Sequence, residues 1–258
     1  MKTMEKLKNK IRKFGIIIVN EGIRQYFDSA PPPPREAKHI VNLSDYVKTL
    51  NPYDLGYYSN NRGPELPSDR FSECRVFTTR SDSLHIIPKG GICAEIGVAY
   101  GDFSQEILNI VQPEQLYLMD IYFKKSGGFF GGNIFTEQGV THEQYVKNKF
   151  KDKPPVVIKK GYSWDIMETF PDNYFDYVYV DGDHTYDAVK RDIAVLKRKV
   201  KNGGIIGFND YTYFFLTSAF ECGVLRAVNE FLSEGEHNVI GYVLQSNKYD
   251  DLIVKFRK

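Results

Sequence analysis

The stretch Cys93-Ala-Glu-Ile-Gly-Val-Ala-Tyr-Gly-Asp-Phe-Ser104 decides the fold. It predicts a buried strand that contains Glu95, a turn framed by Gly97 and Gly101, and the start of a helix. Glycine lets a ligand approach the backbone closely, and the free N–H groups at a helix start can hold an anion. A second strand, 116–120, ends about twenty residues later in Asp120, where a doubly wound α/β protein binds a ribose. The stretch therefore indicates a nucleoside-containing cofactor.

The rest of the chain from residue 85 onward alternates strands with helices. Strands are expected near 92–97, 116–120, 155–159, 175–181 and 204–209, and helices near 102–111, 141–151, 163–169 and 185–201. This order predicts a parallel sheet with helices on both faces. Two further strands, near 238–245 and 251–256, would close it as an antiparallel hairpin. We therefore expect a doubly wound, mostly parallel α/β sheet of seven strands over 85–258.

Residues 1–84 differ in character and predict a helical and irregular N-terminal extension and cap. The segment 6–13 is basic, and the apolar run 14–19 that follows it is too short to span a bilayer. We expect no stable membrane insertion. A basic amphipathic helix here could instead contact a membrane surface, or a second subunit and so make the protein a homo-oligomer. The expectation we favour over these is a solvated helix that packs on its own domain.

The composition excludes several classes of protein. The chain has 258 residues, of which 42% are hydrophobic and 26% charged, as in an ordinary globular protein. A net charge of +1 creates no global field that would attract nucleic acid. Three cysteines, far apart, form neither a metal-ligand spacing nor a disulfide framework. This usage favours a reducing, cytoplasmic location.

Residues 121–140 interrupt the alternation. The part 121–135 mixes four glycines with five aromatic residues and leaves the carboxyl end of the second strand. Ligands bind at that edge of open α/β sheets, so we expect a lid that closes over a substrate. The alternative is a surface insertion without a role.

The second dense group of functional residues is Phe175-Asp-Tyr-Val-Tyr-Val-Asp-Gly-Asp-His184. Asp181 ends a strand, and His184 precedes a helix that Asp183 or Thr185 could cap. A carboxylate and an imidazole at this spacing provide an acid–base group and ligand atoms.

The next parallel strand adds further oxygen-bearing side chains. It ends in Asn209 and Asp210, and the carboxyl ends of parallel strands meet at one rim of the sheet. Asp181, Asn209 and Asp210 are therefore expected to converge on a hard divalent ion such as Mg²⁺.

The pattern Glu-x-Gly-x-x-x-Gly, with an acid ending the second strand, resembles the first motif of class I S-adenosylmethionine-dependent methyltransferases. The resemblance implies a Rossmann-like fold. In that family the strand acid and the glycine turn hold the methionine end of the cofactor, and the second acid holds the ribose. It therefore implies cofactor contacts by Glu95, Gly97, Tyr100, Gly101, Ser104, Asp120 and Asp181. A glycine turn alone is also found at many strand–helix junctions without a ligand.

The run Asp-Gly-Asp-His-Thr-Tyr, with the later Asn-Asp-Tyr, resembles a subgroup of small-molecule O-methyltransferases that includes macrocin-type sugar O-methyltransferases. More distantly it is similar to catechol O-methyltransferases, in which a strand acid and an Asp-Asn pair hold the metal. This sequence has Asp181 in the first place and the pair reversed, as Asn209-Asp210. The resemblance covers roughly 85–215.

The loop after the third strand, 159–165, lies against the adenine in this family. The resemblance implies that Ser163 bonds the ring and that Trp164 stacks on it. The alternative is that Trp164 fills the core and Ser163 caps a helix.

These observations together predict methyl transfer from S-adenosylmethionine to a hydroxyl of a small molecule, a sugar or a natural product, with help from the metal. His184 is the expected base, and Asp181 takes its place if no metal binds. The alternatives are N-methylation on the same fold and a non-catalytic relic that only binds the cofactor.

Overall fold

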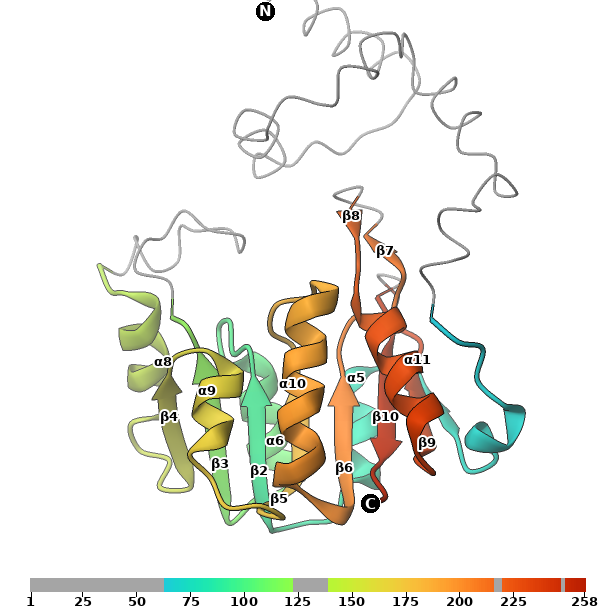
Figure 1. The fold of residues 1–258 in the computed structure, drawn as a ribbon. Helices are drawn as coiled ribbons and strands as arrows, with labels where there is room; N and C mark the ends of the chain where they lie inside the picture. Colours follow the sequence, from blue (N-terminus) through green and yellow to red (C-terminus); the bar gives the residue numbers. More distant parts are fainter. Residues whose placement is uncertain (1–62, 123–138, 216–219, 247–248) are drawn as a thin grey trace, which may run out of the picture. The chain divides into compact units, whose positions relative to one another are not determined.

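The computed structural model describes residues 63–122, 139–215, 220–246 and 249–258 (Figure 1). The expected N-terminal helices, the expected subunit contact and most of the expected lid lie outside these residues.

The described part of the chain is organised around one eight-stranded sheet with the order β1-β9-β10-β6-β5-β2-β3-β4. The central strands β2 to β6 pair in parallel, whereas β10 runs antiparallel to both of its neighbours, β6 and β9. The arrows in Figure 1 show this reversal, since β10 points down and β6 points up. The strands are β1 Arg75–Phe77, β2 Ile92–Ile96, β3 Gln115–Asp120, β4 Val156–Lys160, β5 Phe175–Val180, β6 Val200–Phe208, β9 Asn238–Val243 and β10 Asp251–Lys255.

The sequence analysis expected an α/β fold with a mostly parallel sheet and an antiparallel C-terminal hairpin, and the structure confirms it. All seven expected strands are present. An eighth, β1, pairs in parallel with β9 through Arg75 and Gly241, and extends the sheet at that edge. A separate two-stranded antiparallel pair, β7 Phe214–Phe215 and β8 Phe220–Glu221, follows β6. Neither β1 nor this pair was expected from the sequence.

Helices cover both faces of the sheet. One apolar layer joins the sheet to α9 Ser163–Glu168, α10 Tyr186–Lys199 and α11 Val224–Glu234. The other joins it to α6 Asp102–Ile110, α8 His142–Phe150 and the 3-10 turn that follows α5 Arg80–Ser83. Short 3-10 turns, η2 Ser68–Phe71 and η3 Leu84–Ile86, flank β1 and α5. The helix α11 was not expected from the sequence, although its apolar residues recur at helical spacing.

The alternation of side chains along each strand decides which helices they meet. In β5, Val178 and Val180 belong to the layer under α9–α11, while Tyr177 and Tyr179 belong to the layer under α6 and α8. The same alternation applies to β10, where Leu252 and Ile253 belong to opposite layers. A residue just beyond a strand end that continues this alternation therefore faces the side of the sheet that its position in the alternation predicts.

The order of the strands reverses at β2, because the chain leaves it for β3 on one side and later returns to β5 on the other. Ligands of open α/β sheets bind outside the carboxyl ends of the strands at such a switch point. Within the residues described, no helix is both long enough and apolar enough to cross a membrane.

Candidate active site

The glycine turn after β2 touches the end of β5 directly. Gly97 has φ +80°, and a Cβ on it would lie 1.8 Å from the carbonyl oxygen of Asp181. The Asp181 N–H donates to the carbonyl of Ile96 at 2.7 Å. Only glycine combines this close approach with a left-handed backbone. The expected cofactor turn and the expected acid–base residue are therefore adjacent.

Gly101 ends the turn and begins α6. It has φ +69°, and a Cβ on it would lie 2.6 Å from the ring of Phe150. Tyr100, in the same turn, packs edge-on against Tyr145 with ring centroids 6.2 Å apart. The free N–H groups at the start of α6 thus lie at the switch point of the sheet, where an anionic group could bind.

Glu95 is buried, and burial favours the neutral form of its carboxyl group. Its side chain faces α6, is 2% exposed and accepts a hydrogen bond from the Ser104 hydroxyl. Burial raises the pKa of Glu95 to about 8, although the bond from Ser104 acts in the opposite direction. Glu95 and Ser104 therefore join β2 to α6 as a buried, hydrogen-bonded pair.

Asp120 holds the glycine turn from the neighbouring strand. Its Oδ2 accepts from the Val98 N–H at 2.8 Å, and its Oδ1 accepts from the Tyr122 N–H at 2.8 Å. An ionised carboxylate has about four lone-pair sites, so both oxygens retain capacity for the hydroxyl groups of a ribose.

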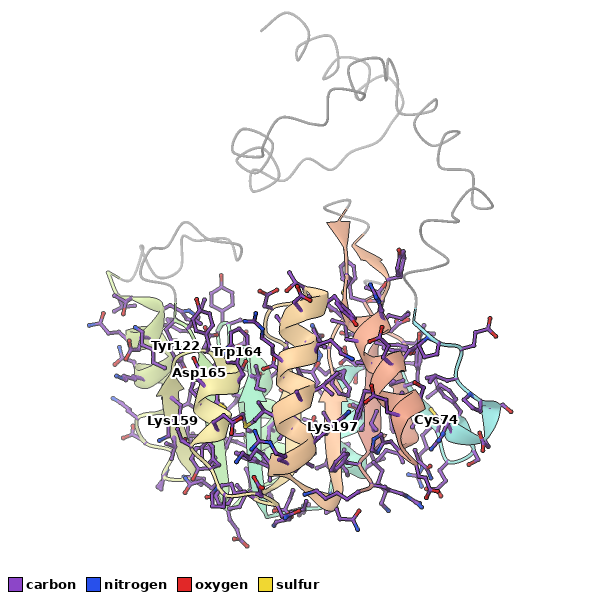
Figure 2. All side chains as sticks on the ribbon, in the orientation of Figure 1. Cys74, Tyr122, Lys159, Trp164, Asp165 and Lys197 are labelled. Carbon is purple, nitrogen blue, oxygen red and sulfur yellow. The ribbon has the colours of Figure 1, made fainter. Side chains whose placement is uncertain are left out.

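The expected adenine loop forms an aromatic stack at the start of α9. The rings of Tyr162 and Trp164 are parallel, with centroids 4.9 Å apart, and the Arg191 guanidinium lies 5.3 Å from the Trp164 ring. Figure 2 places Trp164 at the upper end of α9, on the side where β2, β3 and β4 end. Tyr162 is 56% exposed, so the Tyr162 end of this stack is accessible to solvent.

Ser163 does not cap α9, because Tyr162 occupies the N-cap position. The Ser163 hydroxyl instead donates to Asp192 Oδ1 at 2.5 Å. Asp192 is buried, and burial raises its pKa to about 7. This pair fixes the start of α9 to α10.

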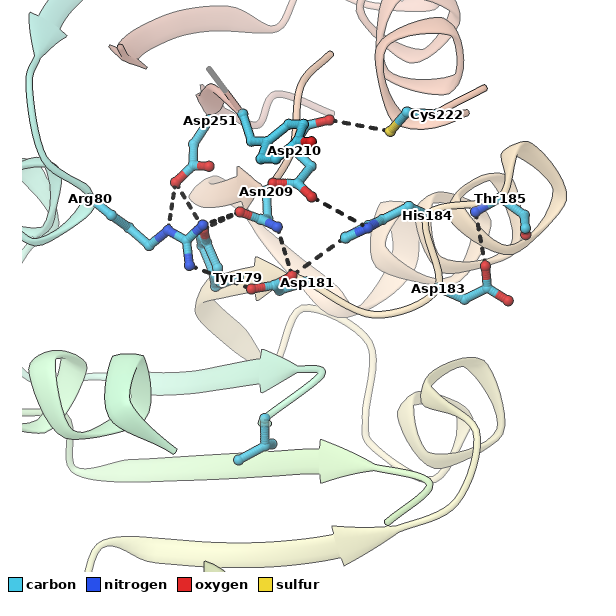
Figure 3. Close-up of polar contacts among 12 residues, drawn as sticks. Arg80, Tyr179, Asp181, Asp183, His184, Thr185, Asn209, Asp210, Cys222 and Asp251 are labelled. Atoms are coloured by element: carbon cyan, nitrogen blue, oxygen red, sulfur yellow. Dashed lines mark hydrogen bonds and ion pairs between the residues drawn. The ribbon is translucent and has the colours of Figure 1, made fainter. Parts of the chain in front are cut away.

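Asp181 is the centre of a polar cluster at the carboxyl rim of β5 and β6 (Figure 3). Its Oδ1 accepts from Asn209 Nδ2 at 2.7 Å and lies 3.4 Å from His184 Nε2. Its Oδ2 lies 3.5 Å from Arg80 Nη1. One carboxylate thus connects an imidazole on one side with a guanidinium on the other.

His184 lies between two carboxylates. Its Nε2 faces Asp181, and its Nδ1 lies 3.5 Å from Asp210 Oδ2. Burial acts to lower the pKa of His184, but the hydrogen bond and charge of Asp181, together with Asp210, outweigh it and raise that pKa. The imidazolium form is therefore stabilised, which makes the neutral imidazole a stronger base. The nearby Asp183 accepts from the Thr185 N–H at 2.9 Å and shapes the turn into α10.

Arg80, in α5, is the residue that the sequence analysis missed. Its Nε donates to Asp251 Oδ2 at 2.9 Å, and its Nη2 donates to Asn209 Oδ1. Burial opposes its charge, but the surrounding Tyr179, Asp251 and Asp181 outweigh burial and raise the pKa of Arg80. No local motif marks this residue, since Asp251 is 171 positions away.

Strand geometry explains why Arg80 meets these partners. Tyr179, Asp181, Asn209 and Asp251 each stand at positions that alternation places on the α5 side of the sheet. Asp251 is the first residue of β10, and it reaches the carboxyl rim of the parallel strands because β10 runs antiparallel to β6. Burial raises the pKa of Asp251 to about 6 against the opposing charge of Arg80.

The expected magnesium ligands do not fit a metal. Asp181 uses both oxygens on protein groups, Asn209 Oδ1 accepts from Arg80 and from the Tyr179 hydroxyl at 3.3 Å, and Asp210 Oδ2 pairs with His184. The Arg80 guanidinium contacts Asp181 and Asn209, and the His184 ring lies between Asp181 and Asp210. Among the residues that the structure describes, no group of three His, Cys, Asp or Glu side chains could hold an ion.

Comparison with known proteins finds similarity over part of the chain. Residues 94–211 match a protein-family model described as a methyltransferase domain. An uncharacterized protein of Acanthamoeba polyphaga mimivirus, R132, is 34% identical over 80 residues, which is 29% of this chain. The chain's match spans about a third of that curated relative, 34% of its length.

Solved structures of similar topology include two methyltransferases. The precorrin-6Y C5,15-methyltransferase of Geobacter metallireducens is 15% identical with a TM-score of 0.46, over 69% of this chain and 85% of that one. An rRNA methylase from Streptococcus thermophilus is 10% identical with a TM-score of 0.47, over 69% and 94%.

Proposed function

We propose that the protein transfers a methyl group from S-adenosylmethionine to a hydroxyl oxygen of a small molecule, a sugar or another natural product. One observation carries this proposal. The glycine turn packs directly on Asp181, so that a Cβ at Gly97 would lie 1.8 Å from its carbonyl oxygen. A cofactor held by the turn would place its reactive end beside the Asp181–His184 pair.

The residues around the switch point fit the cofactor. The start of α6 and the turn at Gly97 offer bare backbone to the methionine end, and Asp120 offers carboxylate oxygens to the ribose. The exposed Tyr162, stacked on Trp164, would offer an aromatic ring to adenine. When bound, S-adenosylmethionine supplies a methyl group already activated by its sulfonium.

His184 is the proposed base. As the new bond from oxygen to methyl carbon forms and the sulfur–carbon bond breaks, the acceptor hydroxyl loses its proton to the neutral imidazole. Asp181 and Asp210, on either side of the ring, stabilise the imidazolium that results. Alignment of acceptor, methyl group and sulfur accounts for the remaining acceleration. The magnesium assistance expected from the sequence is left out, because Arg80 pairs with Asp181 and Asn209 and His184 pairs with Asp210.

The test is a methyl-transfer assay with labelled S-adenosylmethionine over a panel of sugars, phenols and amines. Hydroxyl methylation by the wild type that His184→Ala reduces about a hundredfold, with cofactor affinity retained, would support the proposal. Methylation confined to amines, unaffected by this substitution, would indicate N-methylation instead. Cofactor binding without turnover on any acceptor would favour the non-catalytic relic.

A further inference from the structure

The Arg80 guanidinium contacts two of the three expected metal ligands, Asp181 and Asn209, while the third, Asp210, pairs with His184. The three nitrogens of the guanidinium face three acceptors from three strand ends, namely Asp251 at 2.9 Å, Asp181 at 3.5 Å and Asn209. Figure 3 shows this fork between Asp251 and Asp181. The planar fork of arginine matches such an arrangement, and a lysine ammonium would not.

Further contacts, apart from those to the three acceptors, hold Arg80 in place. The Thr79 hydroxyl caps the helix α5 by accepting from the Asp82 N–H at 3.1 Å, which sets the direction of the next residue. The guanidinium then lies 5.2 Å from the Phe103 ring and 5.3 Å from the Tyr179 ring. Aromatic faces attract a cation at such distances. Arg80 is therefore held at the rim and is not a mobile surface side chain.

The charges around Arg80 require a cation. Asp251 is 0% exposed and Asp181 is a quarter exposed, so two carboxylates meet at low solvent access. Uncompensated buried charge is costly. A divalent ion would need the same oxygens as the guanidinium and would be repelled by it, so the two cations exclude each other.

We propose that Arg80 takes the place of a divalent cation in this site and acts as a positioning residue that holds Asp181 in its orientation toward His184. The site then binds no divalent ion, and the methyl transfer proceeds without one. The inference rests on the proposed function only for its activity measurement, because the cation exchange can be measured on the protein alone.

The first experiment uses Mn²⁺ and the full-length wild type, with binding followed by electron paramagnetic resonance. The wild type is expected to bind no Mn²⁺ that depends on Asp181. Removal of the guanidinium in Arg80→Ala should free the oxygens of Asp181, Asn209 and Asp251. Mn²⁺ should then bind this variant at least about tenfold more tightly than the wild type, and should raise its melting temperature.

Two variants control for charge and for folding. Arg198→Ala removes an equal charge from an exposed ion pair with Glu168 and should gain no Mn²⁺ site. Arg80→Lys keeps the charge and should bind Mn²⁺ no better than the wild type. If Arg80→Ala does not fold, Mn²⁺ binding by the wild type and by Arg80→Lys still tests the proposal. Stoichiometric Mn²⁺ binding by the wild type that Asp181→Asn abolishes would overturn the proposal, and so would tight binding by Arg80→Lys.

The activity measurement separates this inference from the proposed function. Methyl transfer by the wild type should be unchanged after dialysis against EDTA, and loss of turnover that Mg²⁺ restores would contradict the role of Arg80. Absence of methyl transfer under all conditions would remove the proposed function and leave the Mn²⁺ result valid.

Discussion

The substitution Gly97→Ala tests the contact that joins the glycine turn to β5. Two penalties add at this position. An alanine at φ +80° costs about 1–2 kcal/mol from backbone strain alone. Its Cβ would also lie 1.8 Å from the Asp181 oxygen and 2.9 Å from Gly182 Cα, where ordinary contacts begin at 3.4 Å. The ends of β2 and β5 must therefore separate, which adds about 1–3 kcal/mol or more.

Gly203→Ala is the matched control, because Gly203 also has φ +80° and a Cβ there meets nothing within 4 Å. Urea unfolding followed by circular dichroism should show a loss of about 1–2 kcal/mol for Gly203→Ala and about 2–5 kcal/mol for Gly97→Ala. Calorimetric titration should show weaker cofactor binding only for Gly97→Ala. Equal losses of stability in the two variants would refute the argument that the approach to Asp181, and not the backbone angle, requires glycine at 97.

Three further predictions concern the acidic residues. Asp120→Ala should weaken S-adenosylmethionine binding by about 1–3 kcal/mol, measured by calorimetry, whereas Asp102→Ala at an exposed ion pair should not. Because the pKa of Asp192 is raised to about 7, the folded state holds a proton that the unfolded state loses near pH 4, so stability falls as pH rises from about 4 to about 7. Denaturant titrations at several pH values should show that Asp192→Asn removes up to about 4 kcal/mol of this pH-dependent loss of stability. A variant whose free energy of unfolding falls with pH as steeply as that of the wild type would contradict the raised pKa of Asp192. Glu95→Gln should leave cofactor binding at pH 7 nearly unchanged, because burial favours the neutral form of the carboxyl group; a loss as large as that of Asp120→Ala would show that Glu95 binds as an anion.

The regular part of the fold could be predicted because its signals are local. Apolar runs that end in Asp120, Asp181 and Asn209 define strands, and the helix Tyr186–Lys199 has a clear apolar stripe. Strand β1 could not be predicted in this way, since three residues carry little periodicity and their pairing with β9 depends on contacts far along the chain.

In the site, too, the contacts between strand ends could be predicted from the sequence and the distant contact could not. The proximity of Asp181, His184 and Asp210 follows from strand ends that meet at one rim, and the structure places His184 within ion-pair distance of both carboxylates. The presence of Arg80 does not follow, because nothing near position 80 signals a partner at 251. An acidic cluster read without its distant guanidinium resembles a metal site, which is why the sequence favoured magnesium.

The stack of Tyr162 and Trp164 has a practical consequence for spectroscopy. Trp164 is the single tryptophan of the chain, so all tryptophan fluorescence of the protein originates at the start of α9. An adenine that stacks there would change the emission of a fluorophore already flanked by Tyr162 and Arg191. The protein thus contains its own optical probe, and a simple fluorescence titration, without any label, reports on events at this one corner of the sheet.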